Sequence, residues 1–346
     1  MPWWEPENHA DRRPLLLARG RIKAGLRAFF EGQGFTEVEC GALVDSPGNE
    51  THLHAFRTEQ IGADGIAAPA YLHTSPEFAA KKLLAAGEEK IFEFARVFRN
   101  REGGRLHAPE FTMLEWYRAH AEYRAVIADA LALAQTAARI AGATAFRHGG
   151  RSCDPFADAE WLSVADAFRR HEGIDLLATI HPDGTPDRAA LAQVCGFTPA
   201  ADEDWSDIYS KILTAQIEPR LGDGRLTILY EYPRPEAALA RACAHDARVA
   251  ERFELYGCGV ELANGFGELT DAQEQRRRLE SEMAKKALVY GDRYPMDEEF
   301  LQALARMPPA SGVALGFDRL VMLATGAPQI RDVLWTPPLA STKAAP

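Results

Sequence analysis

Apolar residues recur at helical spacing through residues 15–34, which predicts an amphipathic helix that closes on a pair of glycines. Helical and alternating patterns then follow one another along the chain. They predict a strand at 35–39, a helix at 76–86, strands at 91–99 and 110–117, a helix at 118–140, a strand at 226–232, a hairpin at 252–266, a helix at 271–288, and a strand followed by a helix within 312–325. The strands come as hairpins more often than as strand–helix–strand units. We therefore predict a mainly antiparallel sheet and an α+β fold.

The same pattern predicts the domain organisation. Residues 1–14 form an N-terminal extension, residues 15–335 one domain, and residues 336–346 a tail. Within the domain, residues 146–225 are interpreted as a mixed, loop-rich insertion in which we predict no chemistry. Apolar residues make up 47% of the 346 residues, which is enough for a large core.

Composition and charge exclude several classes of protein. No run approaches the roughly 20 apolar residues of a membrane span, and the N-terminus lacks the features of a secretory signal, so we expect a cytoplasmic protein with no membrane partner. The five cysteines are scattered and contain no CxxC pair, so we interpret them as reduced thiols. The formal net charge of -11 argues against a dedicated nucleic-acid binder, although a local basic groove remains compatible with it.

The strand predicted at 91–99 carries a candidate anion-binding group at its end. Period-two alternation places Glu93, Ala95, Val97 and Arg99 on one face. A planar guanidinium beside small side chains leaves a floor against which an anion can lie. A structural salt bridge between this arginine and a neighbouring glutamate is the alternative.

The strand predicted at 110–117 combines a carboxylate with a phenol. Glu115 and Tyr117 share a face with two bulky apolar side chains. A carboxylate in so apolar a strand needs a partner, because burial of an isolated charge is costly. That partner is either a group of the protein or a cationic amine of a ligand.

The hairpin predicted at 252–266 brings two carboxylates within reach of one cation. If Tyr256 faces Glu261 across the turn, Glu254 lies diagonally from Glu261 on the same face, and diagonal neighbours are roughly 7–8 Å apart. Such oxygen ligands suit Mg²⁺, which binds through one or two carboxylates together with substrate phosphates. A solvated acidic face is the alternative.

Arg319 lies in the first turn of the helix predicted near the C-terminus. A cation there is unfavourable, because it lies at the positive end of the helix dipole. Either a nucleotide phosphate or an internal ion pair with Asp318 would offset this cost. The sequence contains no P-loop, Rossmann fingerprint or nucleophile elbow. The four elements together fit attack of a substrate carboxylate on an α-phosphate, which depends on positioning and charge neutralisation.

Three segments carry a resemblance to a known family. VFRN at 97–100 with HAPEFTMLEWY at 107–117 resembles motif 2 of class II aminoacyl-tRNA synthetases, GVALGFDRLVML at 312–323 resembles motif 3, and ELANGFGELTD at 261–271 resembles the lysyl-enzyme segment between them. Over most of residues 15–330 the chain resembles the paralogues of lysyl-tRNA synthetase that attach (R)-β-lysine to a lysine of translation elongation factor P. The resemblance implies a class II synthetase-like antiparallel sheet flanked by helices.

The resemblance also implies an ATP site. Arg99 is expected to bind the α-phosphate and the substrate carboxylate, and Arg319 the γ-phosphate, which makes these two the catalytic residues. Mg²⁺ is expected at Glu254 and Glu261. The remaining ATP-binding residues implied in this way are Asn100, Arg101, Ala108, Leu262 and Gly316.

An amino-acid site for (R)-β-lysine or lysine is implied as well. Its side-chain ammonium is expected at Glu268, Tyr117 and Asn264. Ala314 stands where lysyl-tRNA synthetases usually have glycine, a change that would reshape the pocket for a β-amino acid. The residues expected at the other end of the substrate are Ser75, Pro76 and Glu77, with Glu115 as a further participant.

Three positions differ from the family pattern. Arg101 replaces the motif 2 glutamate that reads adenine, Ala108 replaces a nearby asparagine, and Cys40–Gly41 replaces the Thr-Pro of motif 1. Glu102 or backbone groups are expected to read adenine instead. Motif 1 builds the dimer interface of the family, so a homodimer is expected.

Three functions compete. The leading hypothesis is an ATP-dependent ligase that transfers a lysyl-type group to elongation factor P, because about 14 residues before the first predicted helix leave no room for an anticodon-binding domain. A tRNA-charging enzyme is the alternative, although tRNA is not the expected acceptor. The third is a catalytically silent binding module, against which the retained arginines and carboxylates argue.

Overall fold

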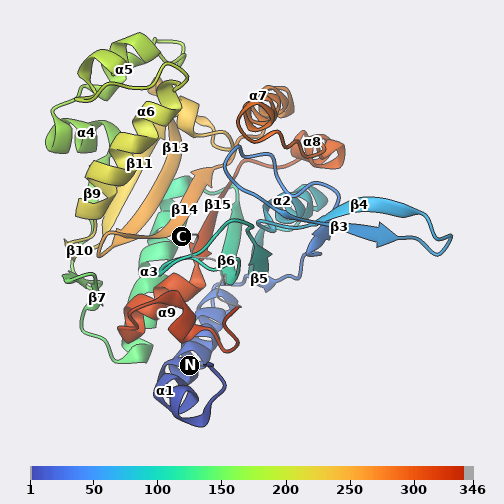
Figure 1. The fold of residues 1–346 in the computed structure, drawn as a ribbon, viewed down its shortest axis with the longest axis vertical. Coiled ribbons are helices and arrows are strands. Elements are labelled where there is room, and N and C mark those ends of the chain that lie inside the picture. Colours follow the sequence, from blue (N-terminus) through green and yellow to red (C-terminus); the bar gives the residue numbers. More distant parts are fainter. Residues whose placement is uncertain (1, 339–346) are drawn as a thin grey trace. The chain divides into compact units, whose positions relative to one another are not determined.

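The computed structural model describes residues 2–338, so most of the tail predicted at 336–346 lies outside the described residues (Figure 1). The chain divides into two compact units. Unit 1 comprises the chain up to His120, Thr270–Pro308 and the chain from Ala314 onward, and unit 2 comprises Ala121–Leu269 and Pro309–Val313. The single domain expected at 15–335 stays a prediction.

Unit 1 contains most of the elements that the sequence predicts near the two ends of the chain. Its strands pair in the orders β1-β5-β6 and β2-β4-β3. Its elements are α1 (Pro6–Glu31), β1 (Thr36–Glu37), β2 (Leu43–Val44), β3 (Phe56–Ile61), β4 (Ala67–Leu72), α2 (Glu77–Ala86), β5 (Lys90–Phe98), β6 (Glu110–Ala119), α7 (Ala272–Tyr290), α8 (Glu298–Leu304), α9 (Phe317–Thr325) and η5 (Ile330–Val333).

The first helix differs from its predicted bounds. It was expected at 15–34 but begins at Pro6, so most of the expected N-terminal extension is helical. Proline suits the first turn of a helix because its φ is preset and its missing N–H would have no helical partner. The first turns of α1 are polar and carry no apolar stripe by which the sequence could reveal them. Arg12 ties these turns to the end of the described chain by donating to the carbonyl oxygens of Arg331, at 3.2 Å, and Leu334.

Strands β5 and β6 pair antiparallel and confirm the predicted faces. Glu93 lies opposite Glu115, Ala95 opposite Met113, and Val97 opposite Phe111. Directly opposed residues point to the same side of a sheet. The predicted anion floor and the predicted carboxylate–phenol face are therefore one continuous surface.

The opposite side of this sheet packs on α1 through aromatic rings. The ring centre of Phe30 lies 4.7 Å from that of Phe92 and 5.5 Å from that of Trp116. All three side chains are buried. This packing gives the surface formed by β5 and β6 a rigid support.

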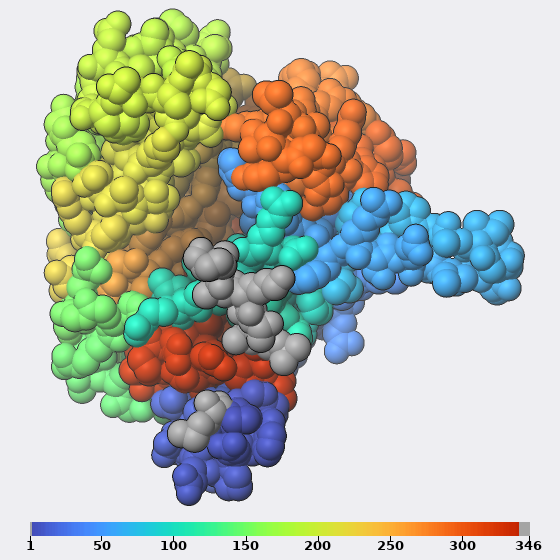
Figure 2. Space-filling view, viewed as in Figure 1, coloured from blue at the N-terminus to red at the C-terminus, as the bar shows by residue number. Residues whose placement is uncertain are grey.

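A two-stranded arm formed by β3 and β4 was not predicted. Strand β3 is almost entirely exposed, and Ile61 and Ile66 at the tip are 69% and 68% exposed. Figures 1 and 2 show the arm in light blue, extending away from the rest of unit 1. Because the arm buries neither face near its tip, its residues show no apolar alternation by which the sequence could reveal it.

Unit 2 contains the middle of the chain. Its principal strands pair in the order β14-β13-β11-β9, with β12 on β13. Its elements are α3 (Tyr123–Ala141), β7 (Phe146–His148), β8 (Arg151–Asp154), β9 (Glu160–Ser163), α4 (Val164–Glu172), η1 (Leu176–Thr179), α5 (Arg188–Val194), α6 (Trp205–Ile212), η2 (Leu213–Ile217), η3 (Glu218–Arg220), β10 (Gly224–Arg225), β11 (Thr227–Pro233), η4 (Arg234–Glu236), β12 (Ala242–Cys243), β13 (Asp246–Gly257) and β14 (Val260–Gly267).

The interpretation of residues 146–225 as loop-rich was wrong. Helices α4, α5 and α6 pack on the strands of unit 2 around a hydrophobic cluster of their own (Figure 1). Within this cluster the rings of Phe168 and Trp205 each stack on Tyr209, with centres 5.2 Å apart. The short helices spread their apolar residues over several turns, which hid the core from a periodicity argument.

The sheet is mainly antiparallel, as predicted. In unit 2 the β11–β13 and β13–β14 pairs are antiparallel, whereas β9 is parallel to β11. Strand β15 (Ala310–Gly316) passes from unit 2 into unit 1, and helix α9 follows it directly, as expected within 312–325. The α+β class is confirmed.

Two predictions from composition can be compared with the structure. All five cysteines are free thiols, as interpreted, and all but Cys40 are buried. Over residues 2–338, we find no helix whose length and apolar character would suit it to crossing a membrane.

Candidate functional site

Arg99 directly follows β5, on the surface formed by β5 and β6. Its Nε atom donates to the carbonyl oxygen of Thr74 at 3.3 Å, and its guanidinium carbon lies 5.4 Å from the ring centre of Phe111. The side chain is half-buried. A guanidinium held at a sheet edge by a carbonyl and an aromatic ring keeps donors for an anion, which agrees with the predicted anion floor.

Glu115 is clamped by two hydroxyl groups. Ser75 donates to one carboxylate oxygen at 2.5 Å, and Tyr117 donates to the other at 2.9 Å. Only 2% of Glu115 is exposed. Burial, and next the charge of Glu77, raise the pKa of Glu115 to about 8, although both hydroxyl groups oppose this shift. Near pH 7 the group is therefore largely protonated, and a cationic amine would favour its charged form.

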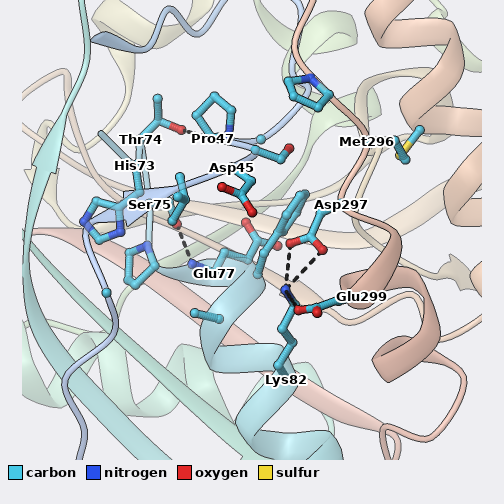
Figure 3. A pocket seen from close by; sticks show the side chains of 18 of the residues that line it. Asp45, Pro47, His73, Thr74, Ser75, Glu77, Lys82, Met296, Asp297 and Glu299 are labelled. Atoms are coloured by element: carbon cyan, nitrogen blue, oxygen red, sulfur yellow. Dashed lines mark hydrogen bonds and ion pairs between the residues drawn. The ribbon is translucent and has the colours of Figure 1, made fainter. Parts of the chain in front are cut away.

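A cavity of about 390 Å³ in unit 1 adjoins these residues, and Figure 3 shows its side chains. Ser75, Pro76 and Glu77, which the sequence assigns to the substrate, are among the residues that line it. The Ser75 hydroxyl accepts from the Glu77 N–H at 3.0 Å, which ties the start of α2 to the Glu115 network. On the other wall Lys82 pairs with Asp297 at 2.8 Å.

Glu50 is a cavity residue that the sequence did not indicate. Burial, and next the charge of Glu77, raise its pKa to about 7, whereas the charge of Arg99 lowers it. The carboxylate therefore lies close enough to Arg99 to interact with it. Glu50 sits in an irregular segment, and only the fold brings it near two residues from other elements.

The loop between β5 and β6 holds three of the expected ATP-binding residues. Asn100 is exposed and donates from its backbone N–H to the carbonyl oxygen of His54 at 2.6 Å. Arg101 has a left-handed φ of 64°, and its guanidinium carbon lies 5.4 Å from the ring centre of Tyr290. Ala108 is buried, with 5% exposed. The guanidinium of Arg101 thus lies over an aromatic ring of unit 1. The sequence did not predict this contact.

Arg319 lies in the first turn of α9, as predicted, and contacts the same loop. Its Nε donates to the carbonyl oxygen of Leu106 at 3.2 Å, and its Nη2 lies 2.7 Å from Nε2 of His107. Gly316 is the N-cap residue of α9 and directly precedes its first residue. The carboxylate of Asp318 pairs with Arg19 and accepts from the Thr112 N–H.

Ala314 faces the surface formed by β5 and β6. It packs against the buried cluster of Ala95, Val97 and Met113. The methyl group of Ala314 therefore lies against these three side chains of β5 and β6. The expected effect of alanine on the shape of the amino-acid pocket stays a prediction.

Two carboxylates of unit 2 share one face, and a β-bulge adds Asn264 to it. Tyr256 lies opposite Glu261, as predicted, but the register then shifts so that Glu254 lies opposite Asn264. Leu262 is the extra residue of β14, which has no opposing residue on β13, and its side chain is buried. The bulge brings Glu261 and Asn264, three positions apart, to the face that carries Glu254.

Glu254 is held firmly in place. Arg252 donates from Nη2 to one carboxylate oxygen at 2.6 Å, and the Tyr256 hydroxyl donates to the other. Burial and the charge of Glu261 raise the pKa of Glu254, while Arg252 opposes this shift. Arg252 thus fixes one of the expected metal ligands, and the alternative of a solvated acidic face is wrong for this buried carboxylate.

Glu218 is a third carboxylate beside this pair, and the sequence did not indicate it. Burial, and next the charges of Glu254 and Glu261, raise its pKa to about 7. Three neighbouring carboxyl groups, two of them with raised pKa values, make a set of oxygen donors suited to a hard divalent cation. The residues present therefore fit Mg²⁺.

The residues expected at the substrate ammonium also include two from unit 2. Asn264, Phe266 and Glu268 follow one another at every second position along β14 and its extension, so they lie on one face. Glu268 is 1% exposed, and the side-chain oxygen of Asn264 is buried without a hydrogen-bond donor among residues 2–338. A buried acceptor of this kind suits an ammonium donor.

Each unit therefore gathers a group of the expected residues. Unit 1 gathers the arginines, the Glu115 network and the start of α2, and unit 2 gathers the carboxylates and Asn264. Glu50, Glu218 and Arg252 belong to these groups although the sequence did not indicate them. Glu50 and Glu218 face charges from distant segments, which no local pattern reports, whereas Arg252 pairs with Glu254 two positions along the same strand.

Comparison with known proteins agrees with this arrangement. Residues 8–339 match the family described as tRNA synthetases class II (D, K and N). The chain belongs to this family, as the resemblance of motifs 2 and 3 implied.

Curated relatives within the family are similar over nearly their whole length. The elongation factor P–(R)-β-lysine ligase of Erwinia tasmaniensis is 42% identical over 338 residues, and that of Salmonella dublin is 41% identical over 337 residues. In both cases 96% of each chain is covered. The predicted resemblance to the paralogues that attach β-lysine is confirmed.

Proposed function

We propose that this protein activates (R)-β-lysine, or lysine, with ATP as an aminoacyl-adenylate and transfers it to a lysine side chain of elongation factor P. The names of its relatives support the substrate and the acceptor. The observation that carries the proposal is the surface formed by β5 and β6. There, Arg99 offers a cation for carboxylate and phosphate, and Glu115 offers a buried acid for an amine.

The proposed reaction proceeds in two steps. First, a carboxylate oxygen of the amino acid attacks the α-phosphorus of ATP, and the bond to pyrophosphate breaks. Arg99 neutralises the charge that builds up on the α-phosphate and orients the attacking carboxylate, while Arg319 binds the γ-phosphate. Then the uncharged amine of the acceptor lysine attacks the activated carbonyl, AMP leaves, and the amine loses a proton.

Glu254 and Glu261 would hold Mg²⁺, and Glu218 would offer a further carboxylate for the same ion. When bound, Mg²⁺ supplies charge neutralisation for the phosphates. Arg252 keeps Glu254 in position. A substitution at Arg252 would therefore act through the metal ligand and not through direct contact with ATP.

In unit 2, Glu268 and Asn264 offer acceptors for a side-chain ammonium. In unit 1, the hydroxyl groups of Tyr117 and Ser75 orient Glu115, and Glu77 lies at the start of α2 beside them. Ala314 limits the space beside Arg99, which favours a substrate whose amine is displaced from the carboxylate by one extra carbon.

Adenine recognition is assigned to the loop between β5 and β6. Arg101, where the family usually has glutamate, lies near the Tyr290 ring, and Glu102 and backbone groups of this loop provide hydrogen-bonding partners for adenine. A homodimer and a cytoplasmic location belong to the same proposal, since elongation factor P acts in translation.

Amino-acid-dependent exchange between ATP and pyrophosphate tests the activation step. We expect faster exchange with (R)-β-lysine than with α-lysine, and none with arginine. Arg252→Lys should raise the Mg²⁺ concentration needed for half-maximal exchange, while a control, Arg248→Lys on the same strand, should not. Absence of exchange with every amino acid, in protein that binds ATP, would instead identify a silent binding module.

A further inference from the structure

A second group of metal-ligating side chains lies in unit 2, outside the groups assigned above. Glu231, Cys243 and His245 each offer one ligand atom, and these atoms all lie within 4.8 Å of one another. We propose that these three residues form a binding site for a borderline-soft divalent cation, with Zn²⁺ as its ligand. This proposal does not depend on the proposed ligase activity.

The backbone gathers the three residues from two neighbouring segments. Cys243 ends β12 and lies opposite Asp246 of β13, so His245 lies in the tight turn between these strands. Glu231 lies in β11, at the point where the register between β11 and β13 shifts. Since β13 pairs with both β11 and β12, it holds the two segments together.

Glu231 adopts a backbone conformation that is unusual for its residue type. Its φ is 56°, in the left-handed region that a non-glycine residue rarely adopts. Such strain persists only where the surrounding structure imposes it. Here it coincides with the position that contributes the carboxylate to the group.

The ligand spacing suits a tetrahedral zinc site. Nε2 of His245 and Oε1 of Glu231 are 3.5 Å apart. Two ligands bound at about 2.0–2.1 Å with a tetrahedral angle are roughly 3.3–3.4 Å apart, so these atoms need little movement. Three protein ligands leave a fourth position for water. The alternative is an ordinary histidine–glutamate pair beside a buried thiol. In that case the sulfur of Cys243 would bind no metal.

The types of ligand discriminate against Mg²⁺. A thiolate and an imidazole suit zinc, whereas Mg²⁺ prefers oxygen ligands. Cys243 is buried, with 6% exposed, while the side chain of His245 is 64% exposed and leaves the site open to entry.

Titration of the full-length, tag-free protein with Co²⁺, in excess Mg²⁺ to occupy oxygen-ligand sites, tests the proposal. A thiolate-to-cobalt charge-transfer band should grow to about one Co²⁺ per chain and be displaced by Zn²⁺. Cys243→Ser should abolish the band. Cys195→Ser removes a different buried thiol of unit 2 and should leave the band unchanged.

His245→Ala provides a second variant at an exposed position, where loss of folding is not expected. It should weaken Co²⁺ binding by roughly tenfold or more, since even indirect partners of a metal contribute that much. Zn²⁺ should raise the Tm of the unmodified protein more than that of His245→Ala. A missing band in the unmodified protein, or a band that both variants retain, would overturn the proposal.

Discussion

Glu115 shows how the fold prepares a single residue for a charged ligand. Its carboxyl group is buried between two hydroxyl donors, and its pKa is raised to about 8. Sequence alone predicted that this carboxylate needs a partner but left open whether the partner is protein or ligand. The structure shows hydroxyl partners that keep the group in place and still leave it mostly neutral near pH 7. A cationic substrate would convert it to the charged form.

We therefore predict that binding of the amino acid releases a proton. At pH 7 the unliganded Glu115 is mostly protonated, and a bound ammonium lowers its pKa, so most of one proton should leave. Calorimetric titration in two buffers with different ionisation heats measures this number. Glu115→Gln should reduce proton release to near zero, whereas Glu218→Gln in unit 2 should change it little. Equal proton release in the unmodified protein and in Glu115→Gln would contradict this role.

Arg99 provides a second prediction at this scale. Arg99→Ala should slow ATP–pyrophosphate exchange by on the order of 100-fold or more, because charge stabilisation at the α-phosphate is lost. Arg96→Ala is a matched control: it removes an arginine of β5 that pairs with Glu110 and points to the other face of the strand. Both variants should unfold within a few degrees of the unmodified protein. Near-normal exchange in Arg99→Ala would remove this residue from the mechanism.

Individual strands and turns fix the positions of these side chains. The β-bulge in β14 brings Glu261 and Asn264 to one face, and Gly265 lets β14 approach its neighbours closely. A Cβ atom at Gly265 would lie 2.5 Å from Cε1 of Phe253 and 2.7 Å from Cγ2 of Val313. The neighbours that come so close to Gly265 are therefore other strands of the protein itself.

We predict that Gly265→Ala destabilises the protein by about 1–3 kcal/mol, because the added methyl group must displace a buried ring or a strand. The shifted strand should also weaken activity. Gly20→Ala is the control, since nothing lies within 4 Å of its Cβ position in the exposed face of α1. That variant should be stabilised by about 0.5–1 kcal/mol. Chemical denaturation measures both, and unchanged stability of Gly265→Ala would show that the strands separate at little cost.

The elements differ in how well the sequence predicted them. Strands β5 and β6 were predicted within two residues because apolar and polar positions alternate where one face is buried. The β3–β4 arm was missed because its tip buries neither face, and the core of residues 146–225 was missed because short helices share it. The bulge in β14 has no local signal either, and neither have Glu50 and Glu218, whose surroundings come from distant segments.

Across the whole molecule, buried acids should set the dependence of stability on pH. The pKa values of Glu115, Glu50 and Glu218 are raised to about 8, 7 and 7. A group whose folded pKa lies above its unfolded value binds more protons in the folded state, so stability falls as pH rises through this range. His54, His73 and His171 have lowered pKa values and act in the opposite direction, but only below about pH 6.5.

We therefore predict that the free energy of unfolding of the unliganded protein falls between about pH 6.5 and 8. The decline should be smaller in Glu115→Gln, which stays neutral over the whole range. Urea denaturation at a series of pH values measures the slope, and Glu110→Gln, a partly exposed acid of the same strand, is the control. A flat profile in the unmodified protein would contradict the raised pKa values.

We propose that the activated amino acid is transferred to a protein and not to tRNA. The protein should be incubated with ATP, Mg²⁺ and (R)-β-lysine together with equal amounts of elongation factor P and tRNA-Lys from the same source. We predict that the intact mass of elongation factor P rises by one β-lysyl group and that the tRNA stays uncharged. Charged tRNA beside unmodified elongation factor P would contradict the claim and identify a tRNA-charging enzyme instead.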